Sequence, residues 1–355
     1  MEHIGIDVHK RECQVCILTE SGELIERRIR TEKGKLEELL KERAKAKVLL
    51  ESSTESEWVA QCLEGLGHEV VVADPNFAAM YATRSRRVKT DKRDARTLAE
   101  ACKLGAYRPA HRVSEQRRHI RAQLSVRQVL VRSRVRYINL AGALLRGAGL
   151  RVGSGDSRNF PGRVEKLSLP EPLKERVAPL LKVLETLNEQ IDELDGVLEQ
   201  LARQDEQVRR LCTVPGVGPV VASAFVCAVD EPERFSGPHQ LEAYLGLVPS
   251  ESSSGEKQRK GRITKAGNTQ VRWLLVQSAM HLLRLRSKPH TAHLRQWAEA
   301  IAQRRGKRIA VVALARRLAG ILFAMMRDAT EFQPPLPRTP QAPAPRPAQS
   351  LEAAA

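Results

Sequence analysis

Hydrophobic positions in the first 75 residues follow two different periods. Short apolar runs separated by polar turns predict three strands in succession, after which helical and strand patterns alternate. We expect strands at 4–8, 14–18, 24–29, 48–50 and 70–73 and helices at 35–43 and 57–66. Three antiparallel strands followed by alternating helix and strand is the element order of the ribonuclease H-like fold. We therefore expect an α/β domain of that class, although a fold alone does not define a function.

A heptad pattern dominates the segment from residue 177 to residue 208. Its apolar residues alternate in spacing between three and four, which is typical of a coiled-coil helix. They are Val177, Leu180, Leu184, Leu187, Ile191, Leu194, Leu198, Leu201 and Val208. A long helix packed on its own domain would show a similar stripe, but a pattern of more than four heptads favours a partner helix. We expect this coiled coil to join copies of the chain into a homodimer, or a dimer of dimers.

The most apolar stretch of the C-terminal half spans residues 309–326, and Arg316 and Arg317 interrupt it. A bilayer span requires about 20 apolar residues with few charges. The N-terminus enters its first strand pattern directly, without the basic and apolar regions of a secretory signal. These patterns predict a cytoplasmic protein with no membrane segment.

The excess of basic residues says more about the partner of this protein than the rest of its composition does. The 355 residues include 59 Lys and Arg against 42 Asp and Glu, a formal net charge of +17. Residues 84–136 hold 17 basic and 4 acidic side chains, and residues 257–317 hold 16 and 1. Residues 165–206, in contrast, hold 5 basic and 11 acidic side chains. Two basic surfaces are thus expected, and they favour nucleic acid as the partner.

Six cysteines are scattered through the chain and are expected to be reduced thiols. Cys13 and Cys16 form a C-x-x-C pair inside a strand pattern. Strand residues three apart face opposite sides of a sheet, so this spacing argues against a shared metal site.

Four carboxylates in the N-terminal third fit a metal site. Asp7 lies inside an apolar strand pattern, and Glu51 follows the apolar run 48–50. Asp91 and Asp94 are three residues apart at the start of a helical pattern, so they share one face of that helix. Each acid alone could be structural, and Asp91 could simply cap its helix. Together they could hold one or two Mg²⁺ ions for phosphodiester chemistry.

Basic residues near these acids and in the second basic segment are expected to contact phosphates. Those near the acids are Arg84, Arg86, Arg87, Lys89, Lys92 and Arg93. Those in the second segment are Lys257, Arg259, Lys260, Arg262, Lys265 and Arg272.

A serine run next to glycine precedes the second basic segment, and Ser254 is its last serine before Gly255. A serine among lysines and arginines could attack a phosphodiester if those cations stabilise its alkoxide and the reacting phosphate. Serine runs are also typical of flexible loops, and the residues alone leave that alternative open.

These motifs together resemble the DEDD insertion-sequence transposases of the one-ten family, the bridge-RNA-guided recombinases, and their relatives the Piv-type DNA invertases. The resemblance is carried by Gly5-Ile-Asp-Val-His-Lys10, Lys89-Thr-Asp-Lys-Arg-Asp-Ala95, Val214-Pro-Gly-Val-Gly218 and the segment 244–268. It implies a RuvC-like metal-dependent domain at 1–110 and a basic helix with a coiled-coil oligomerisation segment at 111–210. A mainly α-helical transposase domain at 211–332 and a disordered proline-rich tail at 333–355 complete the expected chain.

The resemblance also assigns roles to residues. Asp7, Glu51, Asp91 and Asp94 match the acids that bind Mg²⁺, and Ser254 matches the serine that forms a covalent bond to DNA. A noncoding bridge RNA is expected to pair with donor and target DNA.

Two assignments within the resemblance have competitors. The segment Glu51-Ser-Ser-Thr-Glu-Ser-Glu-Trp58 lacks the glycine that the family places before an aromatic residue, so Glu55 is an alternative to Glu51. Ser252 and Ser253 compete with Ser254, although the serine directly before the glycine fits the motif best.

Two other functions fit parts of the sequence. A RuvC-like nuclease would use the carboxylates and water without serine chemistry. A non-catalytic nucleic-acid-binding scaffold would need only the basic surfaces.

Overall fold

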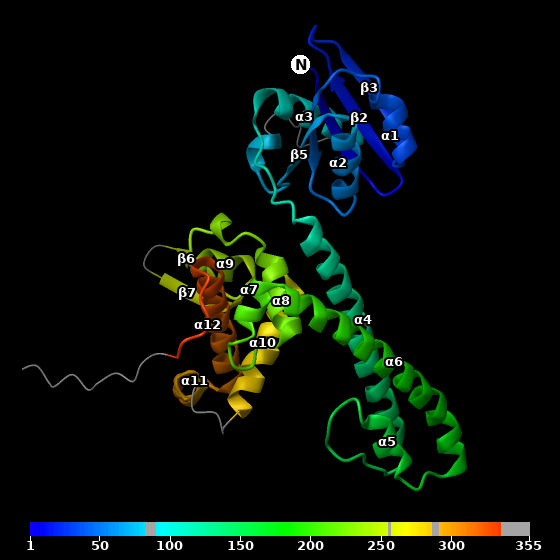
Figure 1. The fold of residues 1–355 in the computed structure, drawn as a ribbon, viewed down its shortest axis with the longest axis vertical. Coiled ribbons are helices and arrows are strands. Elements are labelled where there is room, and N and C mark those ends of the chain that lie inside the picture. The colour runs from blue at the N-terminus through cyan, green and yellow to red at the C-terminus, as the bar shows by residue number, and fades with distance from the viewer. Residues whose placement is uncertain (82–89, 255–256, 286–290, 335–355) are drawn as a thin grey trace, which may run out of the picture. The chain divides into compact units, whose positions relative to one another are not determined.

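The computed structural model describes residues 1–81, 90–254, 257–285 and 291–334, with the backbone alone for 252–254 and 257–260. The chain divides into two compact units, Met1–Val113 and the residues from Ser114 onward (Figure 1). Each unit has its own hydrophobic core, and each is described separately below.

A five-stranded mixed sheet forms the centre of unit 1 (Figure 1). Its strands are β1 His3–Val8, β2 Glu12–Leu18, β3 Leu24–Arg30, β4 Lys47–Glu51 and β5 Glu69–Ala73. They lie in the order β3-β2-β1-β4-β5. The first three strands pair antiparallel, and β4 and β5 extend the sheet in parallel to β1. All five expected strands are confirmed, each within two residues of its predicted ends.

Helices cover both faces of this sheet, as the alternation of its side chains requires. They are α1 Lys33–Leu40, α2 Ser56–Gly65 and α3 Asp91–Leu104, with a short 3-10 helix η1 at Ala78–Tyr81. Ile4, Ile6 and Val8 of β1 pack with α1 and α2. Residues of opposite parity, such as Leu49 of β4, pack with α3 instead. The same parity places Asp7 and Glu51 on the α3 face of the sheet.

The two cysteines of the C-x-x-C pair lie on opposite faces of β2, as expected. Cys13 packs in the core under α1 and α2, whereas Cys16 packs against Ala95 and Ala99 of α3. Both side chains are buried, and burial raises the pKa of the Cys16 thiol to about 11. A buried thiol with a raised pKa is a poor metal ligand and a poor nucleophile.

Gly5 allows α3 to lie directly on β1. A side-chain Cβ at this position would stand 2.2 Å from the carbonyl oxygen of Ala95 and 2.3 Å from the amide nitrogen of Ala99. Both atoms belong to the backbone, so they cannot move aside without moving the helix. Because α3 begins with Asp91 and carries Asp94, this close approach brings two acids to the strand that bears Asp7.

Gly5→Ala is therefore expected to push α3 away from the sheet and to destabilise unit 1 by about 3 kcal/mol, the upper range for overpacking a tight site. Hydrogen–deuterium exchange of the α3 and β1 amides would measure this loss of protection. Gly34→Ala is the matched control, because no atom lies within 4 Å of the added Cβ. Equal protection of α3 in the two variants would contradict this packing role for Gly5.

Unit 2 begins with a long helical hairpin. Its helices are α4 Glu115–Gly147, α5 Phe160–Glu165 and α6 Glu171–Gln204. Arg117 of α4 pairs with Asp205, just after the end of α6, and Arg127 pairs with Asp195. At the other end of the hairpin, Leu145 packs with Val177. These contacts show that α4 and α6 run antiparallel.

The heptad stripe of α6 therefore faces a helix of its own chain. Val177, Leu184, Ile191 and Leu198 are spaced by seven and are all buried. The intervening residues Leu180, Leu187, Leu194 and Leu201 are partly buried. Packing on its own domain, the alternative to an intermolecular coiled coil, thus accounts for the buried half of the stripe. The ion pairs also show that acids of α6 neutralise part of the first basic segment.

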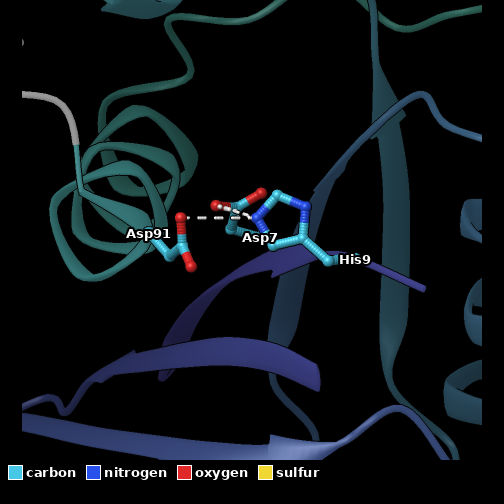
Figure 2. A group of neighbouring side chains, drawn as sticks. All are labelled: Asp7, His9 and Asp91. Carbon is cyan, nitrogen blue, oxygen red and sulfur yellow. Dashed lines mark ion pairs between the residues drawn. The ribbon is translucent and has the colours of Figure 1, made fainter. Parts of the chain in front are cut away.

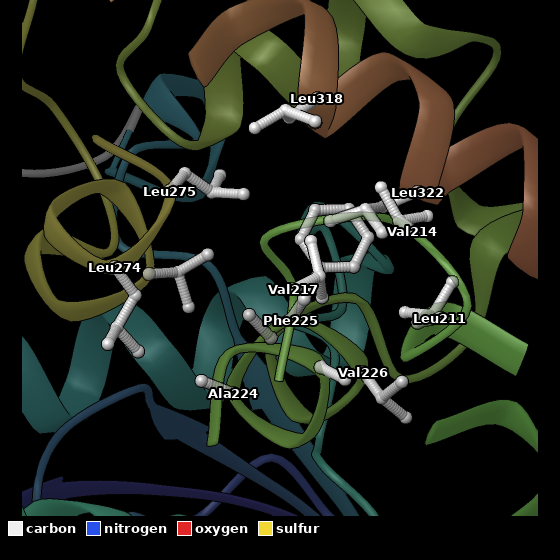
Figure 3. Packing of buried hydrophobic residues seen from close by; sticks show 14 of the residues in the cluster. Leu211, Val214, Val217, Ala224, Phe225, Val226, Leu274, Leu275, Leu318 and Leu322 are labelled. Atoms are coloured by element: carbon white, nitrogen blue, oxygen red, sulfur yellow. The ribbon is translucent and has the colours of Figure 1, made fainter. Parts of the chain in front are cut away.

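The remaining helices of unit 2 build a second core. They are α7 Glu206–Leu211, α8 Pro219–Val229, η2 Pro232–Arg234, α9 Pro238–Tyr244, α10 Thr269–Arg284, α11 Ala292–Arg305 and α12 Lys307–Asp328. Figure 3 shows Phe225 of α8 among aliphatic side chains of the neighbouring helices, including Leu275 and Leu322. Val214 and Val217, from the glycine turn before α8, are buried in the same core.

Helix α12 contains the apolar stretch at residues 309–326. By length and composition it could cross a membrane, with a mean hydropathy of 1.9 over an 18-residue window in spite of its two central arginines. Half of that window is buried inside unit 2. Leu314, Leu318 and Leu322 lie in the core, and Arg316 forms an ion pair with Glu242 of α9. Its apolar residues therefore serve the packing of unit 2.

Candidate metal centre and serine hairpin

Three of the four predicted acids are placed by β1 and the first turn of α3. Asp7 is buried near the end of β1, and Asp94 is buried with 7% of its surface exposed. Asp91 is the first residue of α3 and is exposed. Thr90 caps this helix, since its hydroxyl accepts a hydrogen bond from the Arg93 amide at 3.3 Å. Asp91 is therefore not needed as the cap, and its carboxylate remains available to the site.

His9 lies between the carboxylates of the strand and the helix. Its Nε2 atom is 3.3 Å from Oδ2 of Asp7 and 3.5 Å from Oδ1 of Asp91 (Figure 2). One candidate ligand atom from each of these three residues lies within 4.8 Å of the others. Two carboxylates and an imidazole at this separation fit the donor set of a divalent cation.

The electrostatics of Asp7 show that the other three acids lie near it. Burial raises the pKa of the Asp7 carboxyl above its usual value, and the His9 imidazole opposes this rise. The negative charges of Asp94, Asp91 and Glu51 raise the pKa further. Neighbouring carboxylates repel one another, and a cation bound between them would offset this repulsion, so the arrangement favours binding of a metal ion.

The structure distinguishes Glu51 from its competitor. Glu51 ends β4, its charge acts on Asp7, and its Oε2 accepts a hydrogen bond from the Tyr81 hydroxyl at 2.8 Å. Glu55 instead precedes α2, and its Oε2 accepts a hydrogen bond from Trp58 Nε1 at 2.7 Å. Of the two glutamates, Glu51 is thus the one whose charge acts on Asp7.

His9 is the residue that sequence reasoning missed. It stands two positions after Asp7, and side chains two apart in an extended chain point to the same side. The spacing D-x-H at the end of a strand was therefore a usable signal. The sequence alone does not show that this D-x-H pair belongs to a site, because the acid on the other side of the imidazole, Asp91, comes from a helix far along the chain.

The predicted nucleophile lies at the end of a β-hairpin in unit 2. Strands β6 Pro249–Ser254 and β7 Lys257–Ile263 pair antiparallel, with Ser254 opposite Lys257 and Ser252 opposite Arg259. Ser254 is consequently the last residue of β6, at the turn of the hairpin. Only the backbone is described here, so Ser252, Ser253 and Ser254 remain alternatives.

The base of this hairpin is held by backbone contacts that only glycine permits. Gly246 and Gly267 have φ values of +67° and +74°, in the left-handed region. A Cβ at Gly246 would lie 2.1 Å from the carbonyl oxygen of Ala266, and one at Gly267 would lie 1.9 Å from that of Tyr244. The chain segments that enter and leave the hairpin are thus in direct backbone contact.

Arg272 corrects a predicted nucleic-acid contact. Its side chain is buried, with 8% of the residue exposed, and its Nη1 donates to the carbonyl oxygens of Leu245 at 2.8 Å and Ala266 at 2.9 Å. A buried guanidinium bonded to both segments at the hairpin base is not exposed to a phosphate backbone. It ties the two segments together, because an arginine presents several donors in fixed directions.

Arg272→Gln is expected to loosen the hairpin base by about 3 kcal/mol, since hydrogen bonds to charged groups contribute about 1.5–3 kcal/mol. Hydrogen–deuterium exchange would detect the loss at the amides of Thr264 and Lys265, which donate across the base to the carbonyl oxygens of Val248 and Gly246. Arg284→Gln, at an exposed position of the same helix, should leave these amides unchanged. If both variants protected the hairpin equally, Arg272 would have no role in holding it.

The other basic residues that were predicted to contact phosphates differ in their exposure and in how much of them the structure describes. Lys92 pairs with Glu26 at 2.6 Å, and Arg93, Arg262 and Lys265 are exposed. The backbone of Lys257, Arg259 and Lys260 lies in β7, without described side chains. Arg84, Arg86, Arg87 and Lys89 fall outside the described residues.

Comparisons with known proteins agree with these motifs. A profile described as "Transposase IS116/IS110/IS902 family" matches residues 208–294, and a DEDD transposase profile matches residues 4–149. A probable family 20 transposase of Pseudomonas aeruginosa is 30% identical over 344 residues, covering 94% of this chain and 99% of the relative. The transposase for insertion sequence element IS1111A of Coxiella burnetii is 29% identical over 91% of this chain and 89% of its own.

Proposed function

The chain belongs to the IS116/IS110/IS902 family of transposases, enzymes that cut and rejoin DNA, and on this basis we propose that it combines a Mg²⁺-binding carboxylate cluster with a serine nucleophile. The observation that carries the proposal is the buried Asp7, which lies next to His9 and is acted on by the charges of Asp94, Asp91 and Glu51. The acids and the serine lie in separate units of the chain, so each half of the proposal has its own support.

Unit 1 is assigned to the ribonuclease H-like, RuvC-like class. The support is the strand order β3-β2-β1-β4-β5, with three antiparallel strands extended by two parallel ones. The acids stand at the ends of β1 and β4 and at the start of α3, on one face of the sheet.

Asp7, Asp91, Asp94 and Glu51 would hold the metal, with His9 as a further ligand. Bound there, Mg²⁺ would polarise the scissile phosphate and neutralise its charge. The carboxylates position the ion, and Thr90 and Gly5 hold the helix that supplies two of them. The exposed cations of the chain bind the phosphate backbone.

Ser254 would carry out the covalent step. Its oxygen attacks the phosphorus, a new O–P bond forms, and the bond from phosphorus to one deoxyribose oxygen breaks. The serine proton is transferred to the departing sugar oxygen through solvent. The phosphoserine link keeps the energy of the broken ester, so a sugar hydroxyl of the rejoining strand can reverse the step without ATP.

The partners follow from the family and from the charge. Donor and target DNA are the substrates, and a noncoding bridge RNA that pairs with both would select the sequences. The chain would act as a homodimer or dimer of dimers in the cytoplasm, through surfaces of the α4–α6 hairpin that remain exposed. Val126, Val129 and Leu140 of α4 and Val197 of α6 are large hydrophobic side chains of this kind.

The proposal is tested by trapping the covalent intermediate. Purified protein is incubated with labelled DNA and RNA from the flanking noncoding region, with Mg²⁺ or with EDTA, and resolved on a denaturing gel. A labelled protein–DNA species that requires Mg²⁺ is expected, and peptide mapping should place the nucleotide on the hairpin. Mg²⁺-dependent cleavage without such a species would replace the proposal with a metal-dependent nuclease that uses water. No cleavage and no dependence on the acids would indicate a binding scaffold.

A further inference from the structure

A groove of about 780 Å³ lies in unit 2 between the serine hairpin and helix α12, which are neighbours in Figure 1. Its volume is in the usual range of about 300–1,000 Å³ for small-ligand pockets, which is enough for a nucleotide. Aliphatic side chains line its floor: Leu247, Ile263, Ile309, Val312 and Ala313. Basic side chains surround them: Arg262, Lys265, Arg305, Arg308 and Arg316.

The charges of the groove are one-sided. None of its described lining residues is acidic. Arg316 is neutralised by Glu242, with its Nε 2.5 Å from the carboxylate. Within the described ranges, Arg262, Lys265, Arg305 and Arg308 form no ion pair with an acid. Four cations without an acidic partner among the described residues make the groove electropositive, which favours an anionic ligand.

Lys265 is held at the groove in an unusual conformation. Its φ is +58°, in the left-handed region that normally favours glycine. Its amide donates to the carbonyl oxygen of Gly246 at 3.1 Å, so the hairpin base fixes this backbone. Strained residues of this kind are concentrated at functional sites, where the surrounding structure enforces them.

The aliphatic floor of the groove indicates that the ligand has an apolar part as well as a negative charge. Ile309 is 45% exposed, and the other floor residues continue an apolar surface inward to the buried Leu247. A phosphate chain alone would leave this surface in water. A nucleic-acid strand satisfies both parts, because its phosphates meet the cations and an unstacked base covers the aliphatic floor. A paired duplex does not fit, since its bases are stacked on one another.

We propose that this groove binds a single DNA strand with one base unstacked onto Ile309 and Val312, beside the hairpin that carries the predicted nucleophile. The inference rests on the proposed function for its choice of DNA over other polyanions. It adds a binding site on the C-terminal unit, at the base of the hairpin whose far end carries Ser254.

A fluorescent base analogue tests the site. The full-length protein, in EDTA so that no cleavage occurs, is titrated into a short single-stranded oligodeoxynucleotide containing 2-aminopurine, whose emission rises when it leaves the base stack. The wild type should raise the emission. Ile309→Gln, which removes apolar floor without adding charge, should abolish the rise and weaken binding about tenfold. Arg308→Ala should reduce the slope of log affinity against log salt by about 1.

Matched controls separate the groove from general effects. Leu104→Gln changes an exposed apolar residue at the C-terminal end of α3, and Arg304→Ala removes an exposed cation that does not line the groove. Both should keep the emission rise of the wild type. Binding by Ile309→Gln equal to that of the wild type, or tighter binding of an RNA of the same sequence, would overturn the groove while leaving the covalent chemistry intact. A wild type that binds no DNA would overturn both.

Discussion

Replacing Ser254 with alanine is expected to remove the covalent protein–DNA species completely. The alanine side chain has no oxygen with which to attack the phosphorus, so neither the new bond nor strand release by this route can form. Because Ser254 is the last residue of β6, this change leaves the backbone pairing of the hairpin in place. The measurement is the labelled band on a denaturing gel, with Mg²⁺ and the same DNA and RNA for both proteins.

Ser252→Ala and Ser253→Ala are the matched controls, since both serines lie on the same strand. Each should retain the covalent band at the level of the wild type. If Ser254→Ala retained it and one of the others lost it, the nucleophile would be reassigned within the run. If all three single variants retained it, none of the serines at 252–254 would be the nucleophile.

Asp7→Asn is expected to reduce Mg²⁺-dependent DNA cleavage about a thousandfold. Metal stabilisation of the transition state contributes several kcal/mol, and about 4 kcal/mol corresponds to that factor. The variant should also lose binding of Mn²⁺, a spectroscopic substitute for Mg²⁺, in a calorimetric titration. Glu38→Gln, an exposed acid of α1, is the control and should bind Mn²⁺ as the wild type does.

Stability distinguishes a metal-binding role of Asp7 from a purely structural one. Burial and neighbouring acids raise the pKa of its carboxyl above the unfolded value, so at neutral pH the ionised group favours unfolding. A neutral asparagine should therefore leave the metal-free protein at least as stable as the wild type, as measured by thermal unfolding. A strongly destabilised Asp7→Asn variant that still binds Mn²⁺ would show that Asp7 is a structural residue.

The strands and helices of unit 1 could be predicted because the spacing of apolar residues along the chain follows the period of each element. Alternation of period two along β1 buries Ile4 and Ile6 on one side of the sheet, and the same rule puts Asp7 on the other. The pair Asp91 and Asp94 could be recognised because three residues make almost one helical turn. These signals depend on neighbours in the chain, so they are readable without any tertiary contact.

The sequence patterns did not predict which segments pack against one another or which charges are paired. The stripe from Val177 to Leu198 shows that one face of α6 is buried, but a periodic pattern does not state which surface covers it. Helix α4 of the same chain covers it here. Likewise, a count of basic residues reports charges but not their neutralisation, so Arg127 and Arg272 contributed to the expected surfaces although both are engaged inside unit 2.

The sequence by itself determined the elements of unit 1, the positions of Asp7, Asp91 and Asp94 on their strand and helix, and the family, because periodicity, spacing and motif identity are properties of the chain. Only the tertiary structure showed that His9 lies beside Asp7 and Asp91, that the charge of Glu51 acts on Asp7, and that Arg272 supports the hairpin base. The physical reason is that metal ligation, charge neutralisation and burial depend on distances between residues far apart in sequence, which the packing of α3 on β1 and of α10 against the hairpin base establishes.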